Sequence, residues 1–273
     1  MPVLVAMMFL WAEGHEVCWW LGIMALVNIV LVHAAGNVWS DYHDYKRGVD
    51  TPDTYGIRIL TDGLFTPREV FSLSVTLQVA AILMGLLMVW LTDITLLWFG
   101  LAGITLSLFY PPLKYMALGD LVVLVCYALL PMLGTTFICS GNIVPEVLWL
   151  AVPVGSITVA ILHVNNARDI ETDRRAGIRT FALLTGRATA INVYLFELIL
   201  PYCWLLVTFI QGHVSPWTLL TLITLPLAIG NCKKMLSCKQ GIEAIAKLDE
   251  ATAQLQLAFS LTLAIGLIIE ALT

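Results

Sequence analysis

The sequence predicts an all-α protein that crosses a membrane many times, as a single domain covering residues 1–273 and a bundle of about nine transmembrane helices. Hydrophobic residues make up 59% of the 273 residues and charged residues only 12%, against about 25% in a typical soluble domain. The mean hydropathy is +0.88. Apolar runs of helix length follow one another along the chain with the charges between them, which is the pattern of a multi-spanning membrane protein.

The N-terminal part of the chain supplies the first three segments. The run from Pro2 to Trp11 gives roughly 15 Å of helix, too short for about 30 Å of hydrocarbon, so the first segment is expected to be short or truncated. After a turn at 13–16, the run from Val17 to Tyr45 predicts one long helix. The sequence Thr66-Pro67-Arg68-Glu69 is typical of a capping box with proline at the first helical position, and it opens a span that ends near Trp90.

Six later spans complete the predicted bundle. A span that begins at Ile94 is expected to stop at Tyr110-Pro111-Pro112, because two successive prolines remove backbone donors and disfavour helical geometry. The other five follow from their apolar runs, which are Leu118 to Ile138, Glu146 to Asn165, Ala188 to Ile210, Pro216 to Asn231 and Ala251 to Leu272.

Two groups of Asn and Asp residues, called here the two polar sets, stand at the ends of apolar runs. Charged residues within a membrane span are costly and usually have a function. The first is spaced i, i+4 and i+7 and the second i, i+4 and i+8, so the members of each set share a helix face. They are Asn37, Asp41 and Asp44, and Asn165, Asp169 and Asp173. A loop of about twenty residues, 46–66, follows the first set, and a loop of that length beside such a set favours a functional role.

The positive charges predict the orientation of the chain. All fourteen Lys and Arg residues lie in alternate connections, and the connections around 13–16, 93, 140–146 and 211–215 contain none. The positive-inside rule then places both polar sets at the cytoplasmic side, with the C-terminus outside. We expect the membrane to be an inner (plasma) membrane. The net charge of −5 does not indicate a nucleic-acid partner, and none is expected.

Carboxylates gathered at one membrane face repel one another unless cations neutralise them. Magnesium takes oxygen ligands and shares its remaining positions with substrate phosphates, so the two sets predict a clamp for a diphosphate. One alternative is that these are interfacial charges that cap helix ends in water. Another is a cation-coupled transporter, for which we expect acidic residues near mid-span; Glu197 is the candidate.

Three runs carry a family resemblance: Asp41 to Asp53, Tyr110 to Tyr115, and Asn165 to Thr180. They resemble the intramembrane aromatic prenyltransferase superfamily that includes the ubiquinone-pathway enzymes, and they are most similar to its menaquinone branch, the 1,4-dihydroxy-2-naphthoate polyprenyltransferases. The similarity runs essentially from end to end. In two departures, Ser40 stands where many relatives have Asn, and an Arg-Pro segment of the first helix is expected to be missing.

The resemblance implies a Mg²⁺-dependent enzyme with roles for residues of all three runs. Carried over by position, these are Asn37, Asp41, Asn165, Asp169 and Asp173 as metal ligands, Tyr110, Lys114, Asp44 and Asp50 as catalytic residues, and Lys46, Arg47, Arg58 and Asn166 as substrate-binding residues. The loop 46–66 suits a lid that closes over the site. His163 is interpreted as a packed histidine, whereas the stripe of Asp249, Thr252 and Gln256 either faces the cavity or packs against a neighbouring helix.

The implied partners are a polyprenyl diphosphate, an aromatic acceptor and the lipid bilayer. The implied acceptor is 1,4-dihydroxy-2-naphthoate, prenylated at the carbon that carries the carboxylate with loss of carbon dioxide, as in menaquinone biosynthesis. The alternative acceptor is 4-hydroxybenzoate or another aromatic or lipid compound; hydroxybenzoate keeps its carboxylate.

Overall fold

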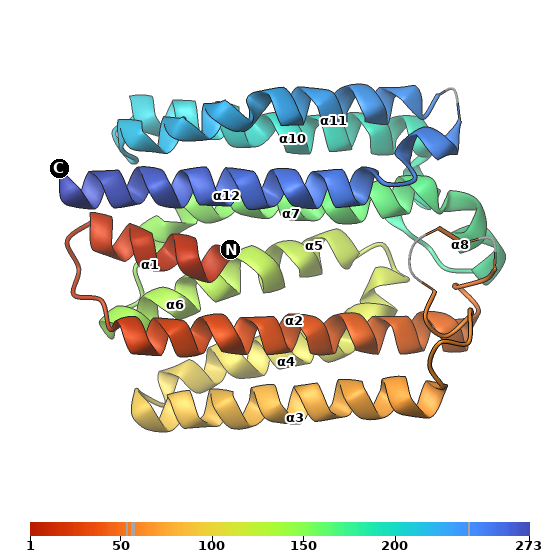
Figure 1. The fold of residues 1–273 in the computed structure, drawn as a ribbon, viewed down its shortest axis with the longest axis horizontal. Helices are drawn as coiled ribbons and strands as arrows, with labels where there is room; N and C mark the ends of the chain where they lie inside the picture. Colours follow the sequence, from red (N-terminus) through yellow and green to blue (C-terminus); the bar gives the residue numbers. More distant parts are fainter. Residues whose placement is uncertain (53, 56–57, 240) are drawn as a thin grey trace.

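The computed structural model describes residues 1–52, 54–55, 58–239 and 241–273. In these ranges the chain is helical and contains no β-strand, and its long helices lie side by side as a bundle (Figure 1). Eight segments of the described chain are long and apolar enough to cross a membrane, and a shorter apolar helix precedes them. The prediction of an all-α, multi-spanning protein with a short first segment is confirmed.

The helices follow the predicted spans to within a few residues. They are α1 (Pro2–Ala12), α2 (Trp19–Arg47), α3 (Pro67–Leu91), α4 (Thr95–Lys114), α5 (Gly119–Leu124), a π-helical turn (Val125–Leu129), α6 (Leu130–Ser140), α7 (Leu148–Arg168), α8 (Ile170–Ala176), α9 (Phe181–Thr185), α10 (Arg187–Ile210), a 3-10 segment (Pro216–Thr224), α11 (Leu225–Ser237) and α12 (Leu248–Leu272). The segments α5 to α6 form one span, and so do the 3-10 segment and α11.

The predicted capping box opens α3. The Thr66 hydroxyl accepts a hydrogen bond from the Glu69 amide at 3.3 Å, and the Glu69 carboxylate accepts one from the Thr66 amide at 2.8 Å. These reciprocal bonds satisfy donors that a helix start leaves free. The end of the 46–66 loop is therefore fixed at a defined residue, beside the C-terminus of α2.

The prediction that the prolines end α4 is wrong. The helix continues through Pro111 and Pro112 to Lys114, although proline supplies no amide to the carbonyl four residues earlier. The carbonyl that Pro112 leaves without a donor is that of Leu108, and it accepts a hydrogen bond from the indole Nε1 of Trp39 in α2 at 3.1 Å. A neighbouring helix that satisfies the freed carbonyl allows proline inside a membrane helix.

The alternating helices bring all connections that carry Lys and Arg to one end of the bundle. The C-terminal ends of α2, α4 and α7 lie at this end with α8, while the chain's C-terminus lies at the opposite end (Figure 1). The most buried of the spans is α7, which packs against α10 and α12. The two polar sets, on α2 and around the end of α7, therefore share one end of the fold.

Candidate active site

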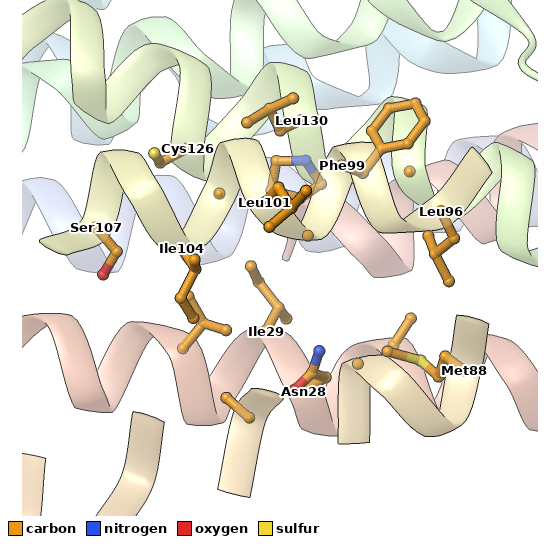
Figure 2. A pocket seen from close by; sticks show the side chains of 18 of the residues that line it. Asn28, Ile29, Met88, Leu96, Phe99, Leu101, Ile104, Ser107, Cys126 and Leu130 are labelled. Atoms are coloured by element: carbon orange, nitrogen blue, oxygen red, sulfur yellow. The ribbon is translucent and has the colours of Figure 1, made fainter. Parts of the chain in front are cut away.

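An apolar cavity lies between α2, α3, α4 and the span formed by α5 and α6 (Figure 2). Its volume is about 320 Å³. Figure 2 shows Met88, Leu96 and Phe99 toward one end of the cavity and Ser107 and Cys126 toward the other. Because most of its lining side chains are aliphatic or aromatic, the cavity suits a hydrocarbon chain rather than a polar ligand.

Glycines keep this cavity open. Gly100 and Gly103 of α4 line it, and a Cβ atom added at either would meet no other atom within 4 Å. A Cβ atom at Gly85 of α3 would lie 3.8 Å from Nδ2 of Asn28, one of the polar residues that Figure 2 shows among the apolar ones. Larger side chains at these positions would fill the space.

The cavity ends beside the charged end of the bundle. Asn37 of α2 and Tyr110 of α4 both line it, and one helical turn further along each helix stand Asp41 and Lys114. An elongated apolar space thus leads directly to the predicted site for a diphosphate. The arrangement suits a molecule with a hydrocarbon tail and a charged head.

Asp44 links the first polar set to the end of α4. Its Oδ2 atom accepts a hydrogen bond from Lys114 Nζ at 2.8 Å, and its Oδ1 atom accepts one from the Tyr115 hydroxyl at 2.7 Å. Asp44 is 7% exposed, so this ion pair is largely withdrawn from water. The pair fixes the lysine ammonium beside the carboxylates of α2, and both predicted residues belong to the same site.

Asp50 lies just beyond the end of α2. Gly48 adopts the left-handed conformation that ends the helix, and the next residue, Val49, packs against Tyr115 and Ile178. Burial and the neighbouring Asp44 carboxylate raise the pKa of Asp50 to about 6, against the opposing effect of Lys114. Burial and the nearby carboxylates together outweigh the stabilisation that Lys114 gives to the charged form of Asp50.

The second polar set lies across a helix break. Asp169 follows the last residue of α7 and precedes α8, and its two oxygens accept hydrogen bonds from Arg168 at 2.9 and 3.1 Å. Asp173 is buried in α8 and accepts a bond from the Thr180 hydroxyl at 2.9 Å. Burial raises the pKa of Asp173 to about 6, and the Thr180 bond opposes it. Burial also raises the pKa of Asp169, against the lowering effect of Arg168.

The two polar sets act on one another electrostatically. The Asp169 carboxylate contributes to the raised pKa of Asp50, and that of Asp44 to the raised pKa of Asp173. The backbone joins the same regions, because the Arg179 amide donates to the Tyr115 carbonyl at 3.0 Å. Across the described chain no three His, Cys, Asp or Glu side chains come close enough to share one metal ion. The individual metal ligands therefore stay a prediction.

The donor set nevertheless fits a hard divalent cation. The amide oxygen of Asn165 is buried, and within the described residues it has no hydrogen-bond partner, a state that is rare in folded proteins unless a ligand or water satisfies the atom. Two carboxylates at the same end of the bundle, those of Asp50 and Asp173, have a pKa of about 6. Oxygen donors with excess negative charge are what Mg²⁺ requires.

The predicted substrate-binding residues differ in how closely they approach this centre. Arg47 stacks on the ring of Tyr115 at 5.0 Å, beside the Asp44 pair. Lys46 is exposed and lies over the Tyr42 ring at 5.7 Å. Arg58 contacts its own loop, through the Pro52 carbonyl and, at 3.4 Å, the Asp62 carboxylate.

The predicted substrate-binding residue Asn166 and the glycines of the predicted lid lie outside these contacts. Asn166 is buried in α7, next to the predicted ligand Asn165. Of the lid glycines in the 46–66 loop, Gly48 and Gly63 have positive φ, while the glycine at position 56 lies outside the described residues.

Sequence reasoning missed the partners that hold the site together. Tyr115 and Thr180 are the last residues of two of the runs that carry the family resemblance, and that position was the available signal. Arg168 reaches from α7 to Asp249 of α12 at 3.3 Å. This pairing shows that the stripe on α12 packs against a neighbouring helix at Asp249. It does the same at Thr252, whose hydroxyl is 2.7 Å from that of Tyr194.

A second buried polar cluster lies between α5, α7 and α10. His163 Nδ1 is 3.1 Å from the Glu197 carboxylate and 3.8 Å from that of Asp120. His163 is 2% exposed and is a buried, paired histidine, as interpreted from the sequence. Glu197, the acidic residue expected near mid-span for a transporter, has this histidine as its partner.

Residues 1–247 match the UbiA prenyltransferase family, and the chain belongs to this family. The mouse UbiA prenyltransferase domain-containing protein 1 is 34% identical over 251 residues, which cover 89% of this chain and 72% of the mouse protein. The 1,4-dihydroxy-2-naphthoate octaprenyltransferase of Bacillus subtilis (strain 168) is 28% identical over 251 residues, covering 90% of this chain and 80% of that enzyme. The resemblance found in the sequence is confirmed.

Solved structures share the fold. A UbiA homolog from Aeropyrum pernix K1 superposes with a TM-score of 0.74 at 17% identity, covering 98% of this chain and 97% of that one. A UbiA homolog from Archaeoglobus fulgidus, bound to GPP and Mg²⁺, superposes with a TM-score of 0.58 at 13% identity, covering 96% of each chain. The chain therefore has the fold of these UbiA homologs.

Proposed function

We propose that this chain transfers a polyprenyl group from an isoprenyl diphosphate to 1,4-dihydroxy-2-naphthoate, with loss of carbon dioxide, in menaquinone biosynthesis. Membership of the prenyltransferase family fixes the class of reaction. The observation that supports this role for the site is the junction at Tyr110 and Lys114, where an apolar cavity ends beside the pair of Lys114 and Asp44. Lys114 also acts electrostatically on the carboxylates of the second set, Asp169 and Asp173. The acceptor is favoured by the motif resemblance and by the Bacillus subtilis relative.

The residues proposed to hold Mg²⁺ are the oxygen donors of both sets: Asn37, Asp41, Asn165, Asp169 and Asp173. The fit rests on the unpartnered Asn165 oxygen and on the raised carboxylate pKa values, and the Archaeoglobus fulgidus homolog carries Mg²⁺ with its diphosphate. When bound, the metal neutralises the negative charge that develops on the leaving diphosphate.

Lys114 supplies positive charge from the protein itself. The ion pair with Asp44 and the adjacent Tyr115 bond fix its ammonium group at the mouth of the cavity. A cation held in place beforehand stabilises the departing diphosphate without reorganisation during the reaction. Arg47, stacked on Tyr115, adds charge at the same end.

The cavity protects the reactive end of the prenyl chain. Breaking the allylic C–O bond leaves the electron pair on the diphosphate and an allylic cation on the chain, and this cation must be kept from water. The apolar lining excludes water, and Tyr110 at the cavity's end is an aromatic residue of the kind that stabilises a cation through its ring.

Prenylation of 1,4-dihydroxy-2-naphthoate needs no base that removes a ring proton. The ring carbon that carries the carboxylate forms the new C–C bond to the prenyl chain, and the bond to the carboxylate breaks. Its electron pair restores the aromatic ring as carbon dioxide leaves. With 4-hydroxybenzoate, the carboxylate stays and a ring proton must be removed instead.

One assay tests the acceptor. The purified protein is given Mg²⁺, geranylgeranyl diphosphate and either acceptor labelled in its carboxylate. We expect prenylated naphthoquinol without label and labelled carbon dioxide. Prenylated product that retains the label, or preferred turnover of hydroxybenzoate, would move the chain to the ubiquinone branch. Flux of a cation across liposomes with no prenylated product would instead support a transporter.

We further propose that the site faces the cytoplasm from an inner (plasma) membrane, with the C-terminus outside. The support is the distribution of positive charge, because every Lys and Arg lies in a connection or near a helix end on the side of the bundle that carries the two polar sets. Positively charged short connections are retained on the cytoplasmic side.

A further inference from the structure

Trp39 satisfies a carbonyl that the sequence of α4 leaves without a donor. Residue 112 is proline, so the Leu108 carbonyl has no amide four residues ahead of it. The Trp39 indole, whose Nε1 group can only donate, lies 3.1 Å from that carbonyl. The contact joins two helices at residues 69 positions apart in the chain.

Contacts on both sides fix the orientation of the Trp39 ring. Its centroid is 4.3 Å from that of His43 on α2 and 6.0 Å from that of Phe71 on α3. His43 Nδ1 in turn lies 2.9 Å from the Trp39 carbonyl. The indole is therefore held between α2 and α3 with its N–H directed at α4.

The Trp39 bond lies next to the central ion pair of the site. The helices α2 and α4 run in the same direction (Figure 1), and Lys114 stands six residues, or about 9 Å, beyond Leu108. The next polar contact between the two helices along this line is the pair of Asp44 and Lys114 at 2.8 Å. Between the two contacts α4 contains both prolines, where helices bend most readily.

We infer that Trp39 is a positioning residue: its indole N–H replaces the amide that Pro112 lacks and sets the register of the last turn of α4, with Lys114, against Asp44 of α2. The catalytic role of this register, which is to hold Lys114 beside the leaving diphosphate, rests on the proposed function. Without the donor, the Leu108 carbonyl is unsatisfied within a membrane span, where water is scarce. The last turn then shifts at the prolines, and the lysine ammonium moves from the position that the leaving diphosphate requires.

The test exchanges one donor for another. Trp39→Phe keeps an aromatic ring and removes the N–H group, whereas Pro112→Ala returns a backbone amide to the Leu108 carbonyl. The double variant should therefore recover what the single Trp39→Phe variant loses. Pro111→Ala is the matched control, because it returns an amide to a different carbonyl. Trp98→Phe controls for loss of an indole on α4 itself, where the side chain is 69% exposed.

We expect Trp39→Phe to lower kcat by between about tenfold and about a hundredfold, the loss associated with displacement of a catalytic group by up to 1 Å. Measurements are made below the melting temperature of every variant, with KM for the prenyl diphosphate recorded separately. A purely structural role lowers the melting temperature and leaves kcat of the folded protein unchanged. Adding Pro112→Ala should restore kcat to within about threefold of wild type, since it returns a hydrogen-bond donor to the Leu108 carbonyl and with it the position of Lys114.

Two results would overturn the inference. One is a double variant of Trp39→Phe and Pro112→Ala whose kcat is reduced by the product of the two single losses. The other is a Trp39→Phe variant that Pro111→Ala rescues as well as Pro112→Ala does. The melting temperatures of the wild type, Trp39→Phe, Pro112→Ala and their double variant form a double-mutant cycle that does not depend on activity. If the wild type forms no prenylated product, the proposed function fails. The non-additivity of the melting temperatures then still decides whether the indole replaces the proline amide.

Discussion

The carboxylates of the site differ in what holds them. Asp44 has Lys114 and Tyr115 as partners on its two oxygens, and Asp169 has the guanidinium of Arg168. Asp173 has the neutral hydroxyl of Thr180 and a pKa near 6. Substitutions that remove charge should therefore affect metal binding most where no cation of the protein competes for the carboxylate.

We predict that Asp169→Asn, and likewise Asp41→Asn and Asp173→Asn, lowers turnover by at least about a hundredfold, because each removes charge where a metal would meet a diphosphate. Mg²⁺ titration of the purified variant measures the change in metal requirement. Asp93→Asn is the matched control, since Asp93 accepts a bond from the Thr95 amide in a turn at the other end of α3. Near-normal turnover of Asp169→Asn would contradict its assignment as a ligand.

Stability should depend on pH in a direction set by Asp50 and Asp173. Both have a pKa of about 6 in the fold, against 3.8 for the free side chain. The folded protein thus binds more protons than the unfolded chain between about pH 4 and pH 6, so its stability falls as pH rises through that interval. Mg²⁺ binds the ionised carboxylates, so it should offset this loss of stability. It should therefore raise the melting temperature more at about pH 7.5 than at about pH 5.

Thermal unfolding of the detergent-solubilised protein measures this pH effect, with and without Mg²⁺. The double variant Asp50→Asn and Asp173→Asn should flatten the dependence, because neither amide titrates. A Mg²⁺ effect that is equal at both pH values in the wild type would mean that these carboxylates are not coupled to the metal.

At the level of elements, α4 forms one wall of the cavity, and its glycines Gly100 and Gly103 lie at different distances from Tyr110 at the charged end. Leu96 and Tyr110, both in the lining, are fourteen residues or about 21 Å apart along the helix. An extended isoprene unit has four chain bonds and advances about 5 Å. The length of the wall therefore corresponds to about four isoprene units.

We predict that leucine at the two α4 glycines limits donor length by depth. Gly103 lies about 10 Å and Gly100 about 15 Å from Tyr110, so Gly103→Leu should retain geranyl diphosphate and lose longer donors. Gly100→Leu should retain farnesyl and lose geranylgeranyl diphosphate. Gly230→Leu in α11 is the control, because its Cβ would also meet open space but outside this cavity. Equal losses for all three donors would contradict the depth argument.

Local signals predicted some element boundaries and missed others. The capping box at Thr66 is contained in four consecutive residues, so the start of α3 could be predicted from the sequence. The continuation of α4 through its prolines depends on Trp39, which is distant in the chain, and no local pattern contains that information. The partner of Glu197 was missed for the same reason, because it stands on another helix.

At the level of the whole molecule, alternation of spans explains why the two polar sets meet. Each set follows an apolar run that ends on the side where Lys and Arg are gathered, so the sequence was sufficient to place both at one end. It was not sufficient to place their partners. The hydroxyls of Tyr115 and Thr180 reach Asp44 and Asp173 through packing of loops at that end, which periodicity does not encode.

The same alternation predicts the orientation of the last helix. Lys233 and Lys234 near the end of α11, and Lys239 and Lys247 before α12, lie at one end of the bundle, and Figure 1 shows the end of α12 at the opposite one. A reporter inserted at Gly241 should therefore be active only as a cytoplasmic reporter, and one fused after Thr273 only as an external one. A reporter in the connection 211–215, which also lacks Lys and Arg, is the control and should match the Thr273 fusion. Finding the Gly241 and Thr273 reporters on the same side would mean that α12 does not cross the membrane, and the proposed external C-terminus would have to be abandoned.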